Sequence, residues 1–499
     1  MISDPPIEKQ TSFLMLPFQH REYAKLWLAQ LVNNVGNQFT YLALQFLVYS
    51  LTQSTFAMGV LAIFQTIPMI IIGPYAGVLV DRYDRKMIMS LSNLVQAFWL
   101  FCIPLTGILL GVESSARVLL IFPLAFLMGA VNRFFFPSRG ASIPKLVPKE
   151  DLLAANSLSA ATYQLSALVG PVTAGVFVAL FNYDMAFYID MLGFLISAVF
   201  IIGIRTNLRP EKLDKPTSLT IKADLQPLKK SNAIISDLGE AYRFLKGYPA
   251  FGYIFILFAF LLFGFGASIV LMVPYLTILI EDSALFDPRA SFGIIRFFIT
   301  LLGLTMTPEL VFGILSALAA LMGLIMALTI GKRRDLPRPL TLMNLACFFA
   351  ALIMFGFAFA PGVKFYTKSM EPVDILAIFW AFFGLIQVFV MIPYQTLAQE
   401  TVPDALRGKL FSFFNIVITV AQISGMAMGG ILSEITDIPT TCFFGGLVII
   451  VASIIGFLVL IWKNYEKDVK ERREAFRTQA PLSTMISSDD PKKDLVIDV

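Results

Sequence analysis

Histidine is almost absent from this chain, since His20 is the only one among 499 residues. A proton relay of several histidines and a histidine-rich metal site are therefore both excluded. Charge is scarce as well: Asp, Glu, Lys and Arg make up 14% of the residues, against about 25% in soluble proteins. The net charge of +4 is small, so the composition gives no support for binding to nucleic acid.

Cysteine is equally rare. Cys102, Cys347 and Cys442 lie far apart, in or at the ends of apolar runs. They lack the paired spacing of a metal or redox site, and we interpret them as small core residues. The chain also lacks a Gly-x-x-x-x-Gly-Lys nucleotide-binding loop, a cluster of paired carboxylates and a nucleophile with a histidine partner. We therefore expect neither a cofactor nor an enzyme.

Apolar residues are correspondingly abundant. They make up 57% of the chain, and the mean hydropathy is +0.76. Continuous apolar runs of about 20 residues are long enough to cross a bilayer as helices. The sequence thus predicts an all-α polytopic membrane protein with twelve transmembrane helices in two six-helix halves. The predicted spans are 27–49, 57–80, 88–110, 118–136, 158–181, 185–204, 251–279, 311–330, 340–360, 375–392, 411–435 and 442–462.

A polar segment, residues 205–249, separates the two halves, 27–204 and 250–462. Its prolines and basic residues are typical of a solvated linker. Within it, Ile235, Leu238, Tyr242 and Leu245 recur at helical spacing, which predicts a short amphipathic helix over 234–245. Residues 1–26 form a short N-terminal tail. Residues 463–499 form a charged tail that we expect to be helical to about Arg477.

Basic residues predict the orientation of these spans. If both termini are cytoplasmic, all 38 Lys and Arg residues lie inside except Arg117, Arg289, Arg296, Lys364 and Lys368. By the positive-inside rule we expect a multi-pass protein of the cell membrane with both tails and the linker in the cytoplasm. Within an external insert at 282–308, the stretch 292–306 is too short for a span, and we interpret it as an interfacial or re-entrant helix.

The two halves echo each other. Pro137 to Pro148 is expected to close span four as a loop, and Pro393 to Pro403 to close span ten in the same way. Each stretch is followed by an apolar helix that contains a glutamine and several glycines. Matched segments at matched positions indicate a duplicated transporter whose site lies between its halves.

One loop carries a family resemblance. The stretch Gly77-Val-Leu-Val-Asp-Arg-Tyr-Asp-Arg-Lys86 resembles the signature loop of the major facilitator superfamily, and the run Leu406-Arg407-Gly408-Lys409 resembles the branch that contains enterobactin and macrolide efflux pumps. The resemblance implies that Asp81 latches the cytoplasmic side against the helix after the Leu406 run. The inner-gate residues would be Gly77, Asp81, Arg82, Arg85, Lys86, Arg407 and Gly408. Alternatively, the loop is basic only because it sets the topology.

A second resemblance lies on the fifth span, where Ser166, Gly170, Pro171 and Gly175 are similar to the antiporter motif of exporters. The resemblance implies that small residues hold the outer ends of the halves together. The alternative is ordinary close packing, since glycine and proline are common in membrane helices.

Polar side chains on three spans predict a cavity. Asn34, Gln38, Tyr41 and Gln45 follow one face of the first span, with Asn37 beside them. In the second half the corresponding residues are Gln387, Asn415, Thr419 and Gln422. Amides in hydrocarbon need partners or water, so these faces are expected to line a substrate cavity. The alternative is hydrogen bonding that holds neighbouring helices together.

Asp190 is the only carboxyl group well inside an apolar span. It either carries the coupling proton or has a structural role, and the sequence leaves both open. Arg133 is expected near the inner end of span four, which would leave the middle of the membrane without Lys or Arg. A cavity of amides and aromatic rings would then suit a large, neutral or cationic compound.

The leading hypothesis is a secondary active transporter that exports an amphipathic small molecule, drug-like or siderophore-like, by proton antiport. An uptake permease or lipid flippase of the same fold is the first alternative, and a non-transporting sensor or scaffold is the second. The expected partners are a small-molecule substrate, protons and the lipid bilayer, and we expect a monomer.

Overall fold

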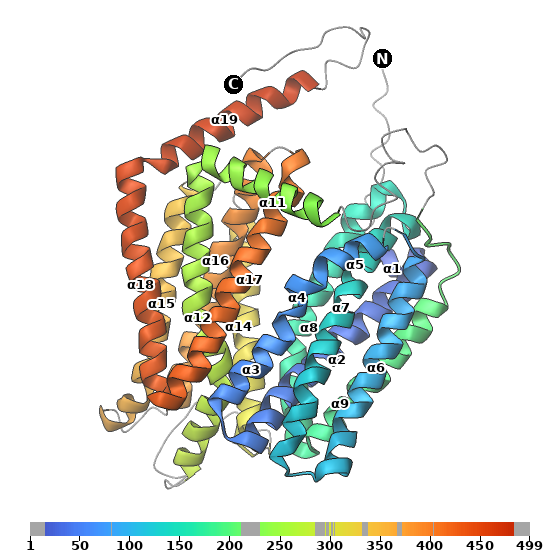
Figure 1. Ribbon diagram of the computed structural model, residues 1–499, viewed down its shortest axis with the longest axis vertical. Coiled ribbons are helices and arrows are strands. Elements are labelled where there is room, and N and C mark those ends of the chain that lie inside the picture. The colour runs from blue at the N-terminus through green and yellow to red at the C-terminus, as the bar shows by residue number, and fades with distance from the viewer. Residues whose placement is uncertain are drawn as a thin grey trace.

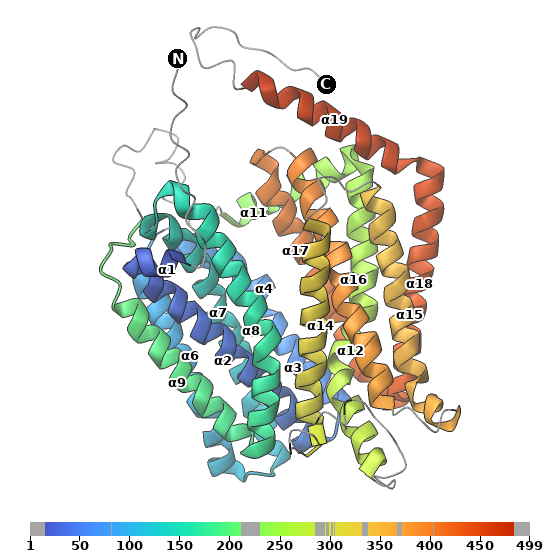
Figure 2. The same ribbon diagram turned by 180° about the vertical axis from the view of Figure 1, so that it is seen from behind.

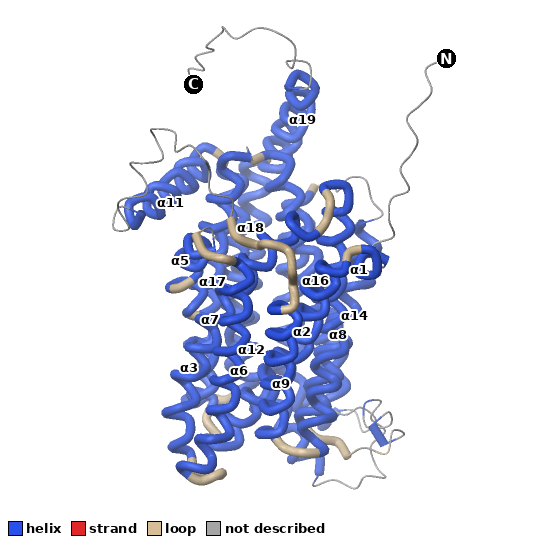
Figure 3. The backbone as a smooth tube through the Cα atoms, turned by 90° about the vertical axis from the view of Figure 1, so that its right-hand side faces the viewer, coloured by secondary structure: helices blue, strands red, loops and turns tan. Residues whose placement is uncertain are grey.

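The computed structural model describes residues 15–80, 82–210, 230–284, 295, 299–300, 303, 305–331, 338–366, 372–402 and 404–483. Throughout these ranges every regular element is a helix (Figure 3). After the short α1 (Leu16–Gln19), the first half contains α2 (Arg21–Thr52), α3 (Thr55–Thr66), α4 (Pro68–Ile71), α5 (Gly73–Val80), α6 (Arg85–Leu110), α7 (Val118–Leu146), α8 (Leu152–Leu180) and α9 (Tyr183–Ile202). The second half contains α12 (Pro249–Ala284), α14 (Pro308–Gly331), α15 (Pro339–Tyr366), α16 (Pro372–Thr401), α17 (Asp404–Ile435) and α18 (Ile438–Lys463).

The predicted twelve spans are confirmed within the described residues. Ten of these helices are long and apolar enough to cross a membrane. The remaining two are α2, whose amides lower its hydropathy, and the broken span α3–α5. Short polar residues start several spans by capping free backbone amides: Asn182 accepts a hydrogen bond from the Met185 amide at 2.8 Å, and Asp437 accepts one from the Thr440 amide at 2.6 Å.

The second span is broken because Pro68 has no amide hydrogen to donate to the preceding turn. The neighbouring helix α7 fits against this break through Gly129, where an added Cβ would lie 3.0 Å from the Gln65 carbonyl oxygen. Other prolines, Pro137 on α7 and Pro393 on α16, do not stop their helices. The expectation of loops from Pro137 and from Pro393 is wrong, since α7 continues to Leu146 and α16 continues to Thr401. Neighbouring helices satisfy the backbone groups that such prolines free.

The two halves stand side by side, and the end of the bundle that holds α1, α11 (Lys230–Gly247) and α19 (Tyr465–Ser483) is called the inner end, because the sequence predicts that it faces the cytoplasm (Figure 1). The predicted linker helix is present as α11. Its buried face differs from the prediction, because Tyr242 is 62% exposed whereas Ala241 is buried. The tail helix α19 extends past Arg477 and is fastened by an ion pair of 2.5 Å between Arg473 and Glu400.

Most of the predicted external helix at 292–306, like the rest of the insert from 285, lies outside the described residues. Ile295 and Ile299 are described and buried. The Ile295 amide donates a hydrogen bond of 3.1 Å to Asp374 Oδ1 at the start of α16. The interfacial or re-entrant position of the insert stays a prediction.

The halves meet at the outer end and lean apart toward the inner end (Figures 1 and 2). On one side Ser54 donates a hydrogen bond to the Glu434 carboxylate, and Ser433 donates one of 2.7 Å to Thr55. On the other side the Tyr183 hydroxyl donates to Glu309 at 2.8 Å. These contacts close the outer end of the interface between the halves.

Candidate functional site

A cavity of about 580 Å³ lies between the halves, on the inner side of the closed outer end. This volume is within the range of about 300–1,000 Å³ that small-molecule sites occupy. Most of its wall comes from the first half, and only Ile269, Gln422 and Met426 come from the second. The lining residues are Asn34, Asn37, Gln38, Thr40, Tyr41, Leu44, Gln45, Ala62, Gln65, Thr66, Gln96, Ala125, Met128, Gly129, Asn132, Arg133, Phe136, Tyr163, Ser166, Ile269, Gln422 and Met426.

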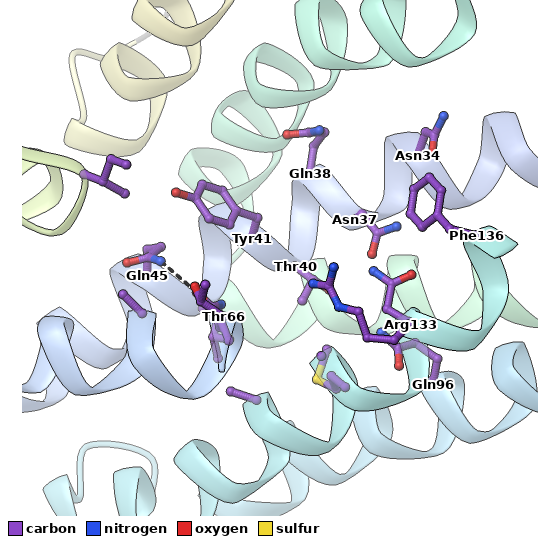
Figure 4. Close-up of a pocket in the computed structure, with 18 of the residues that line it drawn as sticks. Asn34, Asn37, Gln38, Thr40, Tyr41, Gln45, Thr66, Gln96, Arg133 and Phe136 are labelled. Atoms are coloured by element: carbon purple, nitrogen blue, oxygen red, sulfur yellow. Dashed lines mark hydrogen bonds between the residues drawn. The ribbon is translucent and has the colours of Figure 1, made fainter. Parts of the chain in front are cut away.

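Helix α2 presents two polar faces. The five residues predicted for the first span, Asn34, Asn37, Gln38, Tyr41 and Gln45, all lie in the cavity wall (Figure 4). Two amides that precede them face neighbouring helices: Gln30 donates to the Ser159 carbonyl oxygen at 3.0 Å, and Asn33 donates to Asn93 at 3.1 Å. Both readings of the amide stripe therefore apply, each to its own face of the helix.

Of the four residues of the second half that were predicted to line the cavity, one lies in its wall. Gln422 lies in the wall, whereas Gln387, Asn415 and Thr419 lie outside it. Thr419 is buried and donates to the Asn415 carbonyl oxygen at 2.6 Å, as threonines in membrane helices commonly do. The reason is geometric, because the first half supplies most of the wall, no residue of α16 lines it, and α17 reaches it only through Gln422 and Met426.

Asp190 lies on α9, behind the cavity wall. It is 1% exposed, and its Oδ2 atom accepts a hydrogen bond of 2.5 Å from the Thr40 hydroxyl. Its Oδ1 atom is buried without a partner. That atom faces Gly36, where an added Cβ would lie 2.1 Å away. Because Thr40 also lines the cavity, a single side chain connects the buried carboxyl group to the cavity.

The small residues of α8 meet α14 across the outer interface. An added Cβ at Gly175 would lie 2.5 Å from the Glu309 carbonyl oxygen, and one at Gly313 would lie 2.4 Å from the Pro171 carbonyl oxygen. One turn inward, a Cβ at Gly170 would overlap the Gln38 side chain at 2.4 Å. Ser166 lines the cavity, and its hydroxyl is buried without a partner. The backbones of the two halves thus touch where glycine and proline permit it.

The inner-gate residues lie apart in this arrangement, and Asp81 lies outside the described residues. An added Cβ at Gly77 or at Gly408 would meet no atom within 4 Å. Arg85 donates to the Ala141 carbonyl oxygen at 2.7 Å, and Lys86 donates to that of Ile204 at 2.7 Å, so both bind their own half.

Two further gate residues complete the predicted set. Arg82 is exposed at the inner end of the first half. Arg407 donates to the Gln399 carbonyl oxygen at 2.9 Å and to that of Val402 at 3.2 Å, both on its own half.

A family model described as Major Facilitator Superfamily matches residues 26–426 and 370–491. The chain belongs to this superfamily. It is therefore a multi-pass membrane transporter, as the resemblance of its motifs implied.

The relatives of this superfamily member include proteins named as exporters. The MFS-type transporter YfiS of Bacillus subtilis is 28% identical over 445 residues, covering 88% of this chain and 92% of YfiS. The enterobactin exporter EntS of Citrobacter koseri is 23% identical, covering 86% and 90%. Macrolide efflux protein A of Streptococcus pyogenes is 25% identical over 187 residues, which cover 37% of this chain and 44% of that protein.

Solved structures share the fold at low identity. A bacterial homologue of the iron transporter ferroportin, in an inward-facing state, has a TM-score of 0.62 at 14% identity, covering 89% of this chain and 98% of that one. A POT family transporter has a TM-score of 0.63 at 13% identity, covering 89% and 96%.

In this superfamily member the position of Arg133 differs from the prediction. Arg133 was expected near the inner end of its span, but α7 extends for ten further residues beyond Phe136, so Arg133 lies about halfway along it. Its side chain reaches into the cavity toward the part of α2 that carries Asn37 and Thr40 (Figure 4). The cavity therefore holds a basic side chain, whereas the expected cavity held only amides and aromatic rings. The position of Arg133 relative to the middle of the membrane stays a prediction. Helical periodicity continued through Pro137 would have been the signal.

Proposed function

We propose that this transporter is a secondary active exporter of an amphipathic small molecule, driven by proton antiport and working by alternating access. The observation that carries the proposal is the contact between Thr40 and Asp190, in which a residue of the cavity wall binds a buried carboxyl group. A carboxyl group that is buried in a membrane protein and has one free oxygen suits reversible protonation. Proton release and substrate binding would then affect the same segment of α2.

The direction of transport is proposed from two considerations. Relatives named as a macrolide efflux protein and an enterobactin exporter support export. The close contact of Gly175 and Pro171 with α14 supports an outer end that seals tightly while the cavity loads from the inner side.

For the inner gate we propose that Asp81 latches onto the start of α17 when the inner end closes. A carboxylate is favoured at a helix N-terminus by the unpaired amides and the helix dipole. The open space around Gly77 and Gly408 supports this proposal, because both glycines leave room for the two segments to approach. In this scheme Arg82, Arg85 and Lys86 hold the loop and its half in position.

We further propose that the protein functions as a monomer, because one chain supplies the whole wall of the cavity. We propose that it lies in the cell membrane with both termini in the cytoplasm, because of the distribution of its basic residues.

The test of export is uptake into inverted membrane vesicles, where export appears as accumulation. Labelled macrolide, enterobactin and a panel of fluorescent amphipathic dyes serve as probes. With an acidic vesicle interior, we expect accumulation of at least one probe that a protonophore abolishes.

Four outcomes would contradict the proposal. Accumulation only in right-side-out vesicles would favour an uptake permease, and movement of a labelled phospholipid alone would favour a flippase. Accumulation that survives the protonophore and requires sodium would exclude proton coupling. No movement of any probe relative to membranes without the protein would favour a sensor or scaffold.

A further inference from the structure

One arginine in the cavity has no counter-charge. Arg133 is the only charged side chain among the described residues that line the cavity. Its Nε atom is buried and has no hydrogen-bond partner. The other polar groups of the wall belong to amides and hydroxyls, which cannot neutralise a guanidinium.

Among the described residues, the fold treats its fully buried arginine differently from the half-buried Arg133. Arg117, which is 1% exposed, donates to Thr106 at 3.2 Å, to the Val112 carbonyl oxygen at 2.7 Å and to the Asp184 carboxylate at 3.2 Å. A buried charge is tolerated when hydrogen bonds and an opposite charge surround it, and it is costly otherwise. Arg117 has the partners of a structural arginine, whereas Arg133 points its unused donors into a space that a ligand can enter.

We propose that Arg133 binds an oxyanion of the substrate, such as a carboxylate or a sulfonate, and that the transported molecule is an amphipathic anion. This inference rests on the proposed function, because it takes the cavity as the substrate site. A guanidinium is always protonated and its parallel N–H groups match the two oxygens of a carboxylate. The proposed anionic substrate replaces the expected neutral or cationic one, because that expectation required a cavity without a basic side chain.

The rest of the wall suits the remainder of such a molecule. Asn37 and Gln96 lie near the arginine and supply further donors, and Phe136 supplies an aromatic ring (Figure 4). Leu44, Ile269 and Met426 offer an apolar surface for a hydrophobic body. The anion thus has one defined partner, while the apolar contacts are less selective.

The test uses the purified full chain in nanodiscs and two matched pairs of fluorescent probes. One pair is dansyl-phenylalanine and its carboxamide, and the other is naphthalene-2-sulfonate and its sulfonamide. The members of each pair share an apolar body and differ in charge. Equilibrium dialysis gives a Kd for each probe, and a thermal unfolding midpoint verifies that each variant is folded.

We expect at least one anion to bind roughly tenfold or more tightly than its neutral partner, as a charge-assisted hydrogen bond implies. Arg133→Gln should bring that ratio to about one, and Arg133→Lys should retain part of the preference because it keeps the charge without the fork. Arg139→Gln is the matched control: Arg139 is also on α7, stacks on the Phe136 ring at 5.0 Å and does not line the cavity. It should keep the parent ratio.

The inference is overturned if no anion is preferred by the parent protein, including the case in which no probe binds, or if the preference survives in a folded Arg133→Gln variant. These results are separable from those that test export. A charge-selective Kd that depends on Arg133 supports the anion site even if the vesicles show uptake or sodium coupling. Proton-driven export of a neutral probe without charge selectivity would support the proposed function and refute the anion site.

Discussion

Asp190 and Arg133 are an acidic and a basic side chain that are both linked to the cavity, and the link differs between them. Arg133 is part of the wall, whereas Asp190 is reached through Thr40. The sequence singles out Asp190, because a lone carboxyl group in an apolar run is unusual. It does not single out Arg133, because the nearby Pro137 suggests the end of a helix.

Replacing Asp190 with asparagine tests its role in coupling. The amide has nearly the same volume and can still accept the Thr40 hydrogen bond, but it cannot exchange a proton. We expect Asp190→Asn to insert and fold normally and to lose proton-driven accumulation in inverted vesicles, down to the level of membranes without the protein. Glu150→Gln is the control, since it makes the same change from carboxylate to amide at an exposed residue away from the cavity and should keep the parent's accumulation. Full activity of Asp190→Asn would assign Asp190 a structural role.

Gly36 is the residue that lets α2 approach Asp190. A methyl group there would lie 2.1 Å from Oδ1, so Gly36→Ala must move the carboxyl group or separate the two helices. We expect a loss of about 1–3 kcal/mol of unfolding free energy, typical of overpacking, together with impaired proton-driven transport. Gly140→Ala is the control, because a Cβ at Gly140 meets no atom within 4 Å. Unfolding in increasing concentrations of denaturing detergent provides the comparison, and equal stability of the two variants would refute the close contact.

At the scale of elements, the contact between α8 and α14 is the outer seal. Gly175→Val should force α8 away from the Glu309 backbone and so favour opening at the outer end. The readout is a cysteine placed at Gln45 in the cavity wall, with Cys102, Cys347 and Cys442 replaced by serine or alanine. We expect an impermeant thiol reagent added outside intact cells to label it several times faster in the Gly175→Val background. An unchanged rate would mean that this contact does not control access.

The elements themselves were largely predictable, since the apolar runs gave the position of every span. Their lengths were not, because Pro137 and Pro393 suggested ends that the packed helices do not have. The break at Pro68 was missed for the opposite reason, since the run around it is uniformly apolar. Whether a membrane proline breaks its helix depends on which neighbour satisfies the freed backbone groups, and this is a tertiary property.

At the scale of the whole molecule, the duplicated halves predicted a site between them but not its displacement. Gln387 and Asn415 were predicted to line the cavity because polar side chains within apolar spans need partners or water. The structure builds the cavity mainly from the first half, where α2 and α7 carry the polar residues. The similarity between the two halves of the sequence predicts their shared fold. The polar wall of the cavity depends instead on residues that differ between the halves.

The orientation predicted from the basic residues is testable by labelling. Single cysteines at Lys222, in the linker, and at Lys364, after the apolar part of α15, should react with an impermeant reagent from opposite sides of the membrane. We expect Lys364→Cys to react in intact cells and Lys222→Cys to react only in inverted vesicles. Reaction of both from one side would contradict a twelve-span arrangement with cytoplasmic termini.

The central claim is that one cavity is served by two gates that open in turn. Spin labels at Phe181 and Ile435 would report the outer separation of the halves, and labels at Tyr83 and Lys246 the inner separation; all four residues are exposed. Pulsed electron resonance in nanodiscs then gives both distance distributions as a function of pH. The account predicts two distance populations for each pair of labels, with the short outer distance accompanying the long inner one. The ratio of the two populations should shift with pH in the parent protein but not in Asp190→Asn. A single short outer distance under every condition would contradict it.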